Sequence, residues 1–329
     1  MDRPKKTFYN GIDTWRGLAA MMVCIYHFSM HRDDSGYLFD ETSPIRRAGA
    51  YGYLGVYIFF VISGFLIPLS MRQGGYGYRK IGKFLAKRSL RIEPPYIMAV
   101  GVYLALHYYL ARLWGLLPYH VDPLRLLGHV FYVVPFVEGM EWYDAVYWTL
   151  AIEFQFYLLC ALLYPLWTHR LRWVRHFSLL LFLFSVWCTA DQRFVTYFAA
   201  IFGWGISLSL YRSGVLDRFE FALYVLLCGI LSFGGTSVEI GTTAALAFVL
   251  LMLPDFRFRP GIWLGKISYS LYLIHGLAGG TFLMFHYRGD RSLSPVYFLA
   301  ALGISVSAAT LFYLVVEKPF HSLSRKMKL

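Results

Sequence analysis

Long apolar stretches, separated by short polar or basic segments, run through the whole chain. A helix of about 20 apolar residues can cross a lipid bilayer, and about ten stretches reach or approach that length. The expected spans are residues 11–30, 51–70, 94–114, 145–166, 177–190, 194–211, 221–234, 240–254, 267–286 and 295–316. A further apolar stretch, 124–137, is shorter and is expected to be re-entrant or interfacial. The pattern predicts an all-α integral membrane protein with about ten transmembrane helices, forming one domain over residues 1–329.

The basic residues fall in alternate connecting segments. Most of the 31 Lys and Arg lie near the two ends or in residues 71–93, 170–175 and 255–266, whereas residues 31–50 are acidic. Because Lys and Arg mark the cytoplasmic loops of membrane proteins, both termini are expected in the cytoplasm. The formal net charge of +12 then forms a cytoplasmic collar and gives no reason to expect nucleic-acid binding.

Composition agrees with a membrane protein. The chain is 58% hydrophobic and only 15% charged, and its mean hydropathy is +0.50, outside the usual range of soluble domains. The four cysteines lie in apolar segments without metal-ligand spacing, so we expect neither a metal site nor a disulfide framework. Asp13 and Arg16 interrupt the first apolar run, which we therefore read as a retained helix and not as a cleaved signal.

The first span carries three polar side chains, Asp13, Arg16 and His27. Arg16 and His27 are eleven residues apart, so in a helix they share one stripe, about 16 Å apart along the axis. Polar groups inside a membrane usually face a protein interior or a watery cavity, so the stripe suggests a site that runs through the bilayer. Two plainer readings stay open: His27 has a structural role, or Asp13 and Arg16 pair with each other.

Arg88 and Arg91 end the most basic segment of the chain, three residues apart in KRSLRIEPP. If the segment is helical, both point the same way, into the cytoplasm or along its surface. Two guanidinium groups on one face suit phosphate oxygens, and the alternative is contact with lipid headgroups. Glu153 lies inside the fourth span and must be protonated, paired or in a wet cavity. His275 lies mid-span without an assigned role.

Two further observations concern the packing of the helices and the class of function. The pair Ser63–Gly64 is read as a place where two helices approach closely. The sequence has no Walker phosphate loop, no Gly-x-Ser-x-Gly elbow and no His-Glu-x-x-His motif, so it does not indicate an ATP-driven pump or the enzyme classes that use those motifs.

Six motifs in order resemble those of the membrane-bound acyltransferase-3 family, which includes O-antigen, exopolysaccharide and nodulation-factor acetylases. They lie in residues 12–27, 55–65, 88–91, 148–157, 267–275 and 317–320. The first contains the spacing Arg-x10-His, the third is Arg-x-x-Arg, and the fourth reads Trp-Thr-Leu-x-x-Glu. The resemblance covers most of the chain and matches the stand-alone form, without the SGNH hydrolase-like domain that many relatives carry.

The resemblance implies acyl-CoA, most commonly acetyl-CoA, as a cytoplasmic donor, with its phosphates held by Arg88 and Arg91. His27 would be the base that activates an acceptor hydroxyl, or would itself carry the acyl group. Asp13 or Glu153 would orient the imidazole or stabilise its cation, and Arg16 would lie beside the donor. The acceptor would be a carbohydrate or glycolipid at the cell surface, and the location the bacterial cytoplasmic membrane, in contact with its lipids.

Two other classes of function are open to this sequence. A transporter or flippase of an acylated or sugar-containing substrate would also place Arg16, His27 and Glu153 along a path, but only an enzyme would consume acyl-CoA. A sensor or scaffold derived from the enzyme fold is disfavoured because Arg16 and His27 are intact.

Overall fold

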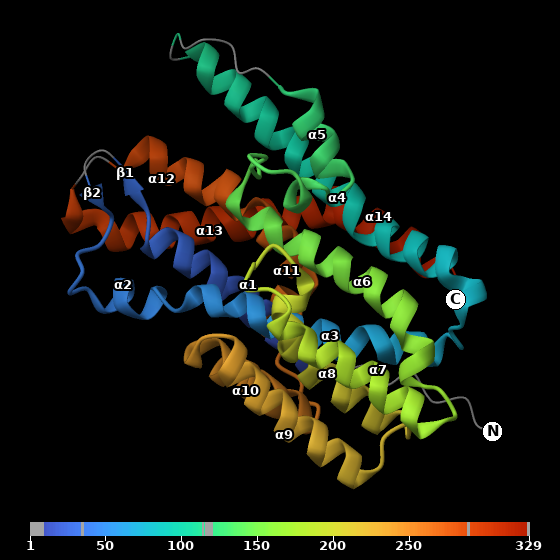
Figure 1. The fold of residues 1–329 in the computed structure, drawn as a ribbon. Helices are drawn as coiled ribbons and strands as arrows, with labels where there is room; N and C mark the ends of the chain where they lie inside the picture. The colour runs from blue at the N-terminus through green and yellow to red at the C-terminus, as the bar shows by residue number, and fades with distance from the viewer. Residues whose placement is uncertain (1–9, 34–35, 114, 116–120, 288–289, 328–329) are drawn as a thin grey trace.

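The computed structural model describes residues 10–33, 36–113, 115, 121–287 and 290–327, and in this part the chain is a bundle of helices (Figure 1). Its α-helices are α1 (Asn10–Ser29), α2 (Pro44–Gly49), α3 (Gly55–Gln73), α4 (Ile81–Leu113), α5 (Pro123–Val130), α6 (Trp148–Trp167), α7 (Arg172–Phe184), α8 (Ala199–Arg212), α9 (Arg218–Gly235), α10 (Val238–Met252), α11 (Arg259–His275), α12 (Thr281–His286), α13 (Ser294–Phe312) and α14 (Lys318–Lys326). Strands β1 (Arg32–Asp33) and β2 (Gly36–Tyr37) form a short antiparallel hairpin. Turns of 3₁₀ helix occupy Gly52–Leu54, Tyr78–Lys80, Val134–Phe136, Ala145–Tyr147, Ser185–Trp187, Val195–Phe198 and Arg291–Leu293. Turns of π-helix occupy Gly276–Gly280 and Tyr313–Glu317.

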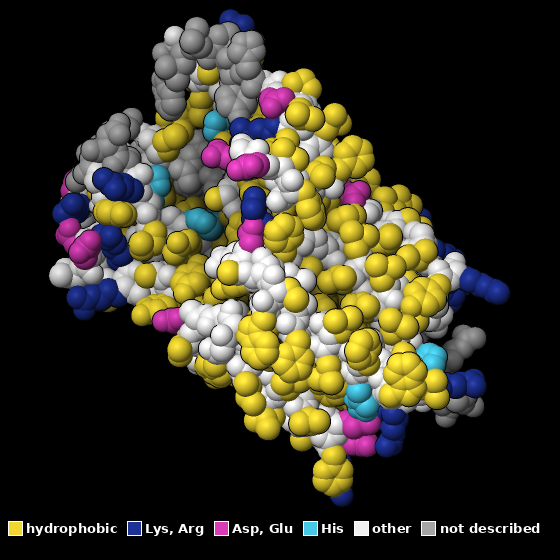
Figure 2. All heavy atoms as spheres, viewed as in Figure 1, with side chains coloured by type: hydrophobic (Ala, Val, Ile, Leu, Met, Phe, Trp, Pro, Cys, Tyr) yellow, Lys and Arg dark blue, Asp and Glu magenta, His cyan; other side chains and the backbone are white. Residues whose placement is uncertain are grey.

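The all-α prediction is confirmed, and every expected span coincides with a helix. Within the described ranges, 5 helical segments are long and apolar enough to cross a membrane: Pro44–Gln73, Tyr78–Leu113, Ala145–Trp167, Arg218–Gly235 and Arg291–Lys326. The other expected spans correspond to α1, α7, α8, α10 and α11 with α12. Hydrophobic side chains cover most of the face in Figure 2, where charged groups lie mainly toward the ends of the bundle. This surface suits lipid, while the number of crossings stays a prediction.

The third span differs from expectation. It does not start at Pro94 but belongs to the 33-residue helix α4, which begins at Ile81 and contains both Pro94 and Pro95. Prolines remove backbone donors, yet membrane helices tolerate them where neighbouring helices supply hydrogen bonds. The neighbouring helix α11 contacts α4 beside the prolines, where the Tyr269 hydroxyl donates to the carbonyl oxygen of Ile92, 2.6 Å away. The helix therefore carries Arg88 and Arg91 to the wall of an internal cavity, and not onto an outer face of the bundle.

Two pairs of glycines allow helices to cross closely. A Cβ atom on Gly64 would lie 2.2 Å from the carbonyl oxygen of Phe202 in α8, and one on Gly205 would lie 2.1 Å from that of Val61 in α3. The close approach expected at Gly64 is therefore confirmed. On α1 and α11, a Cβ atom on Gly265 would lie 1.9 Å from the carbonyl oxygen of Asp13. These crossings bring together the helices that carry the polar residues.

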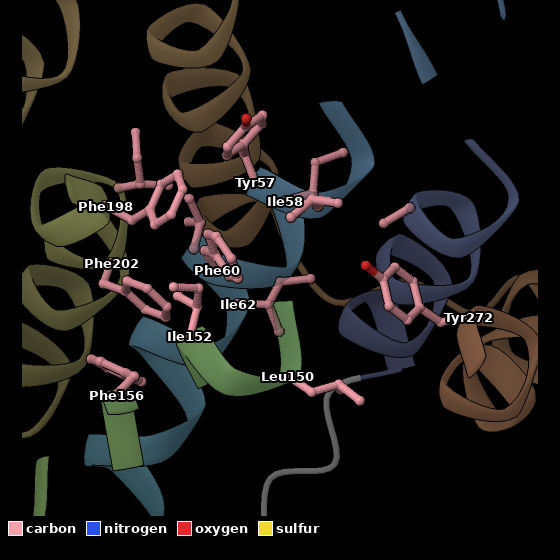
Figure 3. Close-up of a cluster of buried hydrophobic side chains, with 14 of the residues drawn as sticks. Tyr57, Ile58, Phe60, Ile62, Leu150, Ile152, Phe156, Phe198, Phe202 and Tyr272 are labelled. Atoms are coloured by element: carbon pink, nitrogen blue, oxygen red, sulfur yellow. The ribbon is translucent and has the colours of Figure 1, made fainter. Parts of the chain in front are cut away.

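An aromatic cluster fills the space between α3, α6 and α8 (Figure 3). The ring of Phe202 stacks on that of Phe156, with centroids 4.0 Å apart, and on that of Phe60 at 4.8 Å. Phe198 contacts Phe60 from the same side, at 5.1 Å. Aromatic rings bury large apolar areas in fixed geometry, so this cluster holds rigidly the helices that form one wall of the internal cavity.

Candidate functional site

An internal cavity lies between the helices that carry most of the polar residues singled out above. Its empty space is about 890 Å³ when the open solvent at its mouth is included, and about 100 Å³ of that space can hold the centre of a water molecule. Side chains from α1, α3, α4, α6, α11 and the turn Tyr313–Glu317 line it, including Arg16, Ser63, Arg88, Arg91, Glu153, Tyr157, Tyr269, Tyr272 and Glu317. Four residues predicted for the site, Arg16, Arg88, Arg91 and Glu153, therefore share one cavity, although they come from three helices.

Arg88 is the most buried of the three arginines, with 8% of its surface exposed. Its Nη2 donates to the Ser70 hydroxyl, and its guanidinium lies 5.7 Å from the centroid of the Tyr157 ring. Its Nε has no hydrogen-bond partner in the described part of the chain. Buried polar groups without partners are rare in proteins, and this one belongs to a residue of the cavity lining.

The cavity contains two carboxylates as well. Glu153 Oε1 accepts a hydrogen bond from the Tyr157 hydroxyl at 2.5 Å, and lies 3.4 Å from the hydroxyl of Ser63. Glu317 Oε2 accepts from the backbone N–H and the hydroxyl of Ser270, at 3.1 and 2.6 Å. Neither carboxylate forms an ion pair with a lining arginine among the described residues, so the guanidinium groups keep their donors for another partner.

Asp13 lies apart from this arrangement. It is not among the residues that line the cavity, and it interacts with Arg16 electrostatically without a direct ion pair between described atoms. The simpler interpretation, a direct ion pair between Asp13 and Arg16, is therefore wrong. Asp13 is fourteen residues before His27 on α1, about 21 Å along the helix, too far to touch the imidazole.

His27 lies outside the cavity lining and forms a pair with His275 of α11. The His275 Nε2 and His27 Nδ1 atoms are 3.0 Å apart, and the ring centroids are 4.9 Å apart. His27 Nδ1 also lies 3.0 Å from the carbonyl oxygen of Val23. Neither Asp13 nor Glu153 hydrogen-bonds to His27, so the group that orients this ring is His275, which the sequence reasoning left without a role.

Tyr272 connects the cavity to the histidine pair. Its side chain lines the cavity, and its ring centroid is 6.3 Å from that of His275, one turn later on α11. Its hydroxyl lies 2.8 Å from the Thr149 hydroxyl and donates to the carbonyl oxygen of Val146 at 3.1 Å. The arginines and the histidines are therefore the two ends of one region, separated by a hydrogen-bonded tyrosine.

Tyr157, Tyr272, His275 and Glu317 belong to this region but were not predicted as site residues. All four lie in motifs already noted in the sequence, residues 148–157, 267–275 and 317–320. Their position in those motifs was the available signal, but nothing in the sequence indicates which neighbouring helix each side chain faces.

A sequence model of the acyltransferase-3 family, described as an acyltransferase domain, matches residues 9–314. The chain belongs to this family. A protein of Acidianus two-tailed virus, provisionally named an acetyltransferase, is 26% identical over 94% of this chain and 91% of its own length. Nodulation protein 10 of Rhizobium leguminosarum bv. viciae is 26% identical over 80% of this chain and 81% of its own length. A Staphylococcus aureus protein (strain COL), provisionally named an O-acetyltransferase, is 24% identical over 96% of this chain and 58% of its own length.

No solved structure matches this acyltransferase-3 chain. Family membership supports acyl transfer by a membrane protein over the transporter and scaffold alternatives.

Proposed function

We propose that this chain is a membrane O-acyltransferase that moves an acetyl group from acetyl-CoA to a hydroxyl of a cell-surface or lipid-linked carbohydrate. The observation that carries the proposal is the cavity in which Arg16, Arg88 and Arg91 converge without ion-pair partners among the described residues. CoA thioesters carry several phosphate charges, and guanidinium groups bind phosphate oxygens through paired donors. The unpartnered Nε of Arg88 supplies one such donor.

The rest of the cavity suits the remainder of this donor. Apolar side chains such as Val56, Phe59 and Leu66 line it beside the arginines, and apolar walls with a few charged groups are typical of small-molecule sites. The phosphates would lie at the arginines and the pantetheine arm along the apolar wall, with the thioester toward Tyr272.

His27 is proposed as the base. Its imidazole removes the proton of the acceptor hydroxyl, the hydroxyl oxygen attacks the thioester carbonyl carbon, and the carbon–sulfur bond breaks. The proton then passes from the imidazolium to the departing thiolate, so that CoA leaves as a thiol. Initial attack by His27 itself on the thioester would use the same lone pair. In both routes Arg16 stabilises the acetyl-CoA donor. Asp13 and Glu153 contribute negative charge in and beside the cavity and do not orient the imidazole.

Membrane placement follows from the charge pattern. We propose about ten crossings, with both termini and the arginine end of the cavity on the cytoplasmic side, and His27 toward the outside of a bacterial cytoplasmic membrane. The support is the distribution of basic segments and the order of Arg16 and His27 along α1. A carbohydrate acceptor is supported by the family resemblance and by the similarity to a nodulation protein.

The test uses the purified chain in lipid nanodiscs, with acetyl-CoA labelled in its acetyl group and a glycolipid extract from the source cells. Wild type should release CoA thiol and label the glycolipid, and His27→Ala should do neither. His286→Ala is the matched control, because His286 is exposed and bonds its own helix in the same way, Nδ1 to the carbonyl oxygen of Phe282. Absence of CoA release from wild type would reject the enzyme and favour a transporter.

A further inference from the structure

The two histidines that meet between α1 and α11 differ sharply in their surroundings. His275 is 1% exposed and lies at the end of α11, directly before the π-helical turn Gly276–Gly280. Turns of π-helix are rare in proteins, and those that occur are often at functional sites. Phe28 lies against the ring of His275, with centroids 6.0 Å apart. His27 is only partly buried, so of the two imidazoles it is the one that an acceptor can approach.

The hydrogen bonds of His275 fix which of its nitrogens carries a proton. Its Nδ1 lies 3.1 Å from the carbonyl oxygen of Leu271 and 2.9 Å from that of Tyr272. Carbonyl oxygens only accept hydrogen bonds, so Nδ1 is the donor. In the neutral ring, Nε2 therefore has a lone pair, and that lone pair faces His27.

The same comparison of donors and acceptors then shows which nitrogen of His27 carries the proton. Its Nδ1 is 3.0 Å from the carbonyl oxygen of Val23 and 3.0 Å from His275 Nε2. Both neighbours are acceptors, so His27 Nδ1 must be the donor, shared between them. A neutral imidazole has one N–H, and the lone pair of His27 is therefore on Nε2.

We propose that His275 is a positioning residue that holds His27 in the tautomer with a basic Nε2. The inference rests on the proposed role of His27 as the base. When Nε2 takes the proton of the acceptor hydroxyl, His27 becomes an imidazolium whose Nδ1–H still donates to His275 Nε2. His275 keeps its own Nδ1 proton and takes none, so it orients and stabilises the cation without entering the proton transfer.

A carboxylate contributes charge at the same place. Asp144, the residue directly before the 3₁₀ turn that leads into α6, interacts electrostatically with His27. Its Oδ2 lies 3.1 Å from the position of a Cβ atom on Gly276, beside the π-helical turn. Its Oδ1 accepts a hydrogen bond from the backbone N–H of Val146 at 3.1 Å. The carboxyl group of Asp144 acts on His27 at a distance, while the direct contacts to His27 Nδ1 come from His275 and the carbonyl oxygen of Val23.

Two polar substitutions of His275 separate its role in orienting His27 from its role in packing. In His275→Gln the side-chain oxygen reaches about as far as Nε2 and still accepts from His27. In His275→Asn the amide reaches only to the position of Nδ1, so it keeps the bond to the helix carbonyls and loses the bond to His27. We expect His275→Asn to lower kcat by about 100-fold or more, since a wrong tautomer of a catalytic histidine is known to cost up to about 10⁴-fold. His275→Gln should remain within about tenfold of wild type, and neither should change KM for acetyl-CoA.

The second readout is the nitrogen-15 NMR shift of His27 in histidine-labelled protein in nanodiscs, identified by its loss in His27→Gln. Wild type and His275→Gln should show a protonated Nδ1, and His275→Asn a mixture of tautomers. His286→Gln is the control and should match wild type in both readouts.

A protonated Nε2 on His27 in neutral wild-type protein, or a wild-type kcat in folded His275→Asn, would overturn the positioning role. If wild type shows no acetyl transfer but the tautomer still depends on His275, the proposed function fails and the positioning geometry stands.

Discussion

Replacing Arg88 by Gln tests the donor site at its most informative residue. The guanidinium of Arg88 is 8% exposed, lines the cavity and has an Nε without a partner among the described residues. A hydrogen bond to a charged group contributes about 1.5–3 kcal/mol when both partners are buried. Losing one such bond to a phosphate should therefore raise the Kd for acetyl-CoA by about 10- to 150-fold. Arg88→Lys keeps the charge but not the paired donors, and should fall between Gln and wild type.

The assay is calorimetric titration of acetyl-CoA into the protein in nanodiscs, with thermal unfolding measured on the same samples. Arg112→Gln is the control, because Arg112 lies on the same helix and contacts a tyrosine ring at a similar distance, 5.4 Å from Tyr108, but outside the cavity. A buried charge without a counterion destabilises the folded state, so Arg88→Gln should unfold at the same temperature as wild type or higher. An unchanged Kd in Arg88→Gln would refute the phosphate site.

Two further predictions concern stability. Gly205→Ala places a methyl group 2.1 Å from the carbonyl oxygen of Val61 and should lower the unfolding temperature, because overpacking costs about 1–3 kcal/mol. Gly101→Ala is the control, since a Cβ atom there meets nothing within 4 Å. Equal unfolding temperatures of the two variants would contradict the close crossing of α3 and α8. Asp217 caps α9, and its hydrogen bond from the backbone N–H of Glu220 lowers the pKa of its carboxyl below the ordinary 3.8. The stabilisation by this cap is complete above that ordinary pKa and is lost as the pH falls through the lower folded-state pKa. Thermal melts should therefore show Asp217→Ala less stable than wild type at neutral pH and equal to it in strong acid. A difference in stability that persists in acid would contradict this capping role.

Most helix positions were predictable because they follow from long, mainly apolar runs. The segments expected at 145–166 and 221–234 differ from α6 and α9 by only a few residues. The start of α4 was not predictable in this way, because a basic segment followed by Pro94 and Pro95 has the composition of a loop. In the structure the helix runs through both prolines, and α11 contacts it there through the hydrogen bond from Tyr269 to Ile92. Such a contact between distant segments leaves no local pattern.

The same limit explains what was missed at the site. The stripe of Arg16 and His27 is visible within α1 because it depends only on helical spacing. The partner of His27 depends on how α1 and α11 cross, and that crossing is set by contacts such as Gly265 against the backbone of Asp13. Asp13 and Glu153 were the carboxylates that the sequence offered as orienting groups, but the fold puts His275 against the imidazole instead.

Proton NMR of surface carbohydrate is the most direct test of the central claim, that this acyltransferase-3 protein O-acetylates such a carbohydrate through His27. The strains to compare lack the gene and are complemented with wild type, His27→Ala or His286→Ala. We expect the O-acetyl signals to vanish on deletion and to return with wild type and His286→Ala but not with His27→Ala. Signals that persist in the deletion strain, or that return fully with His27→Ala, would contradict the account.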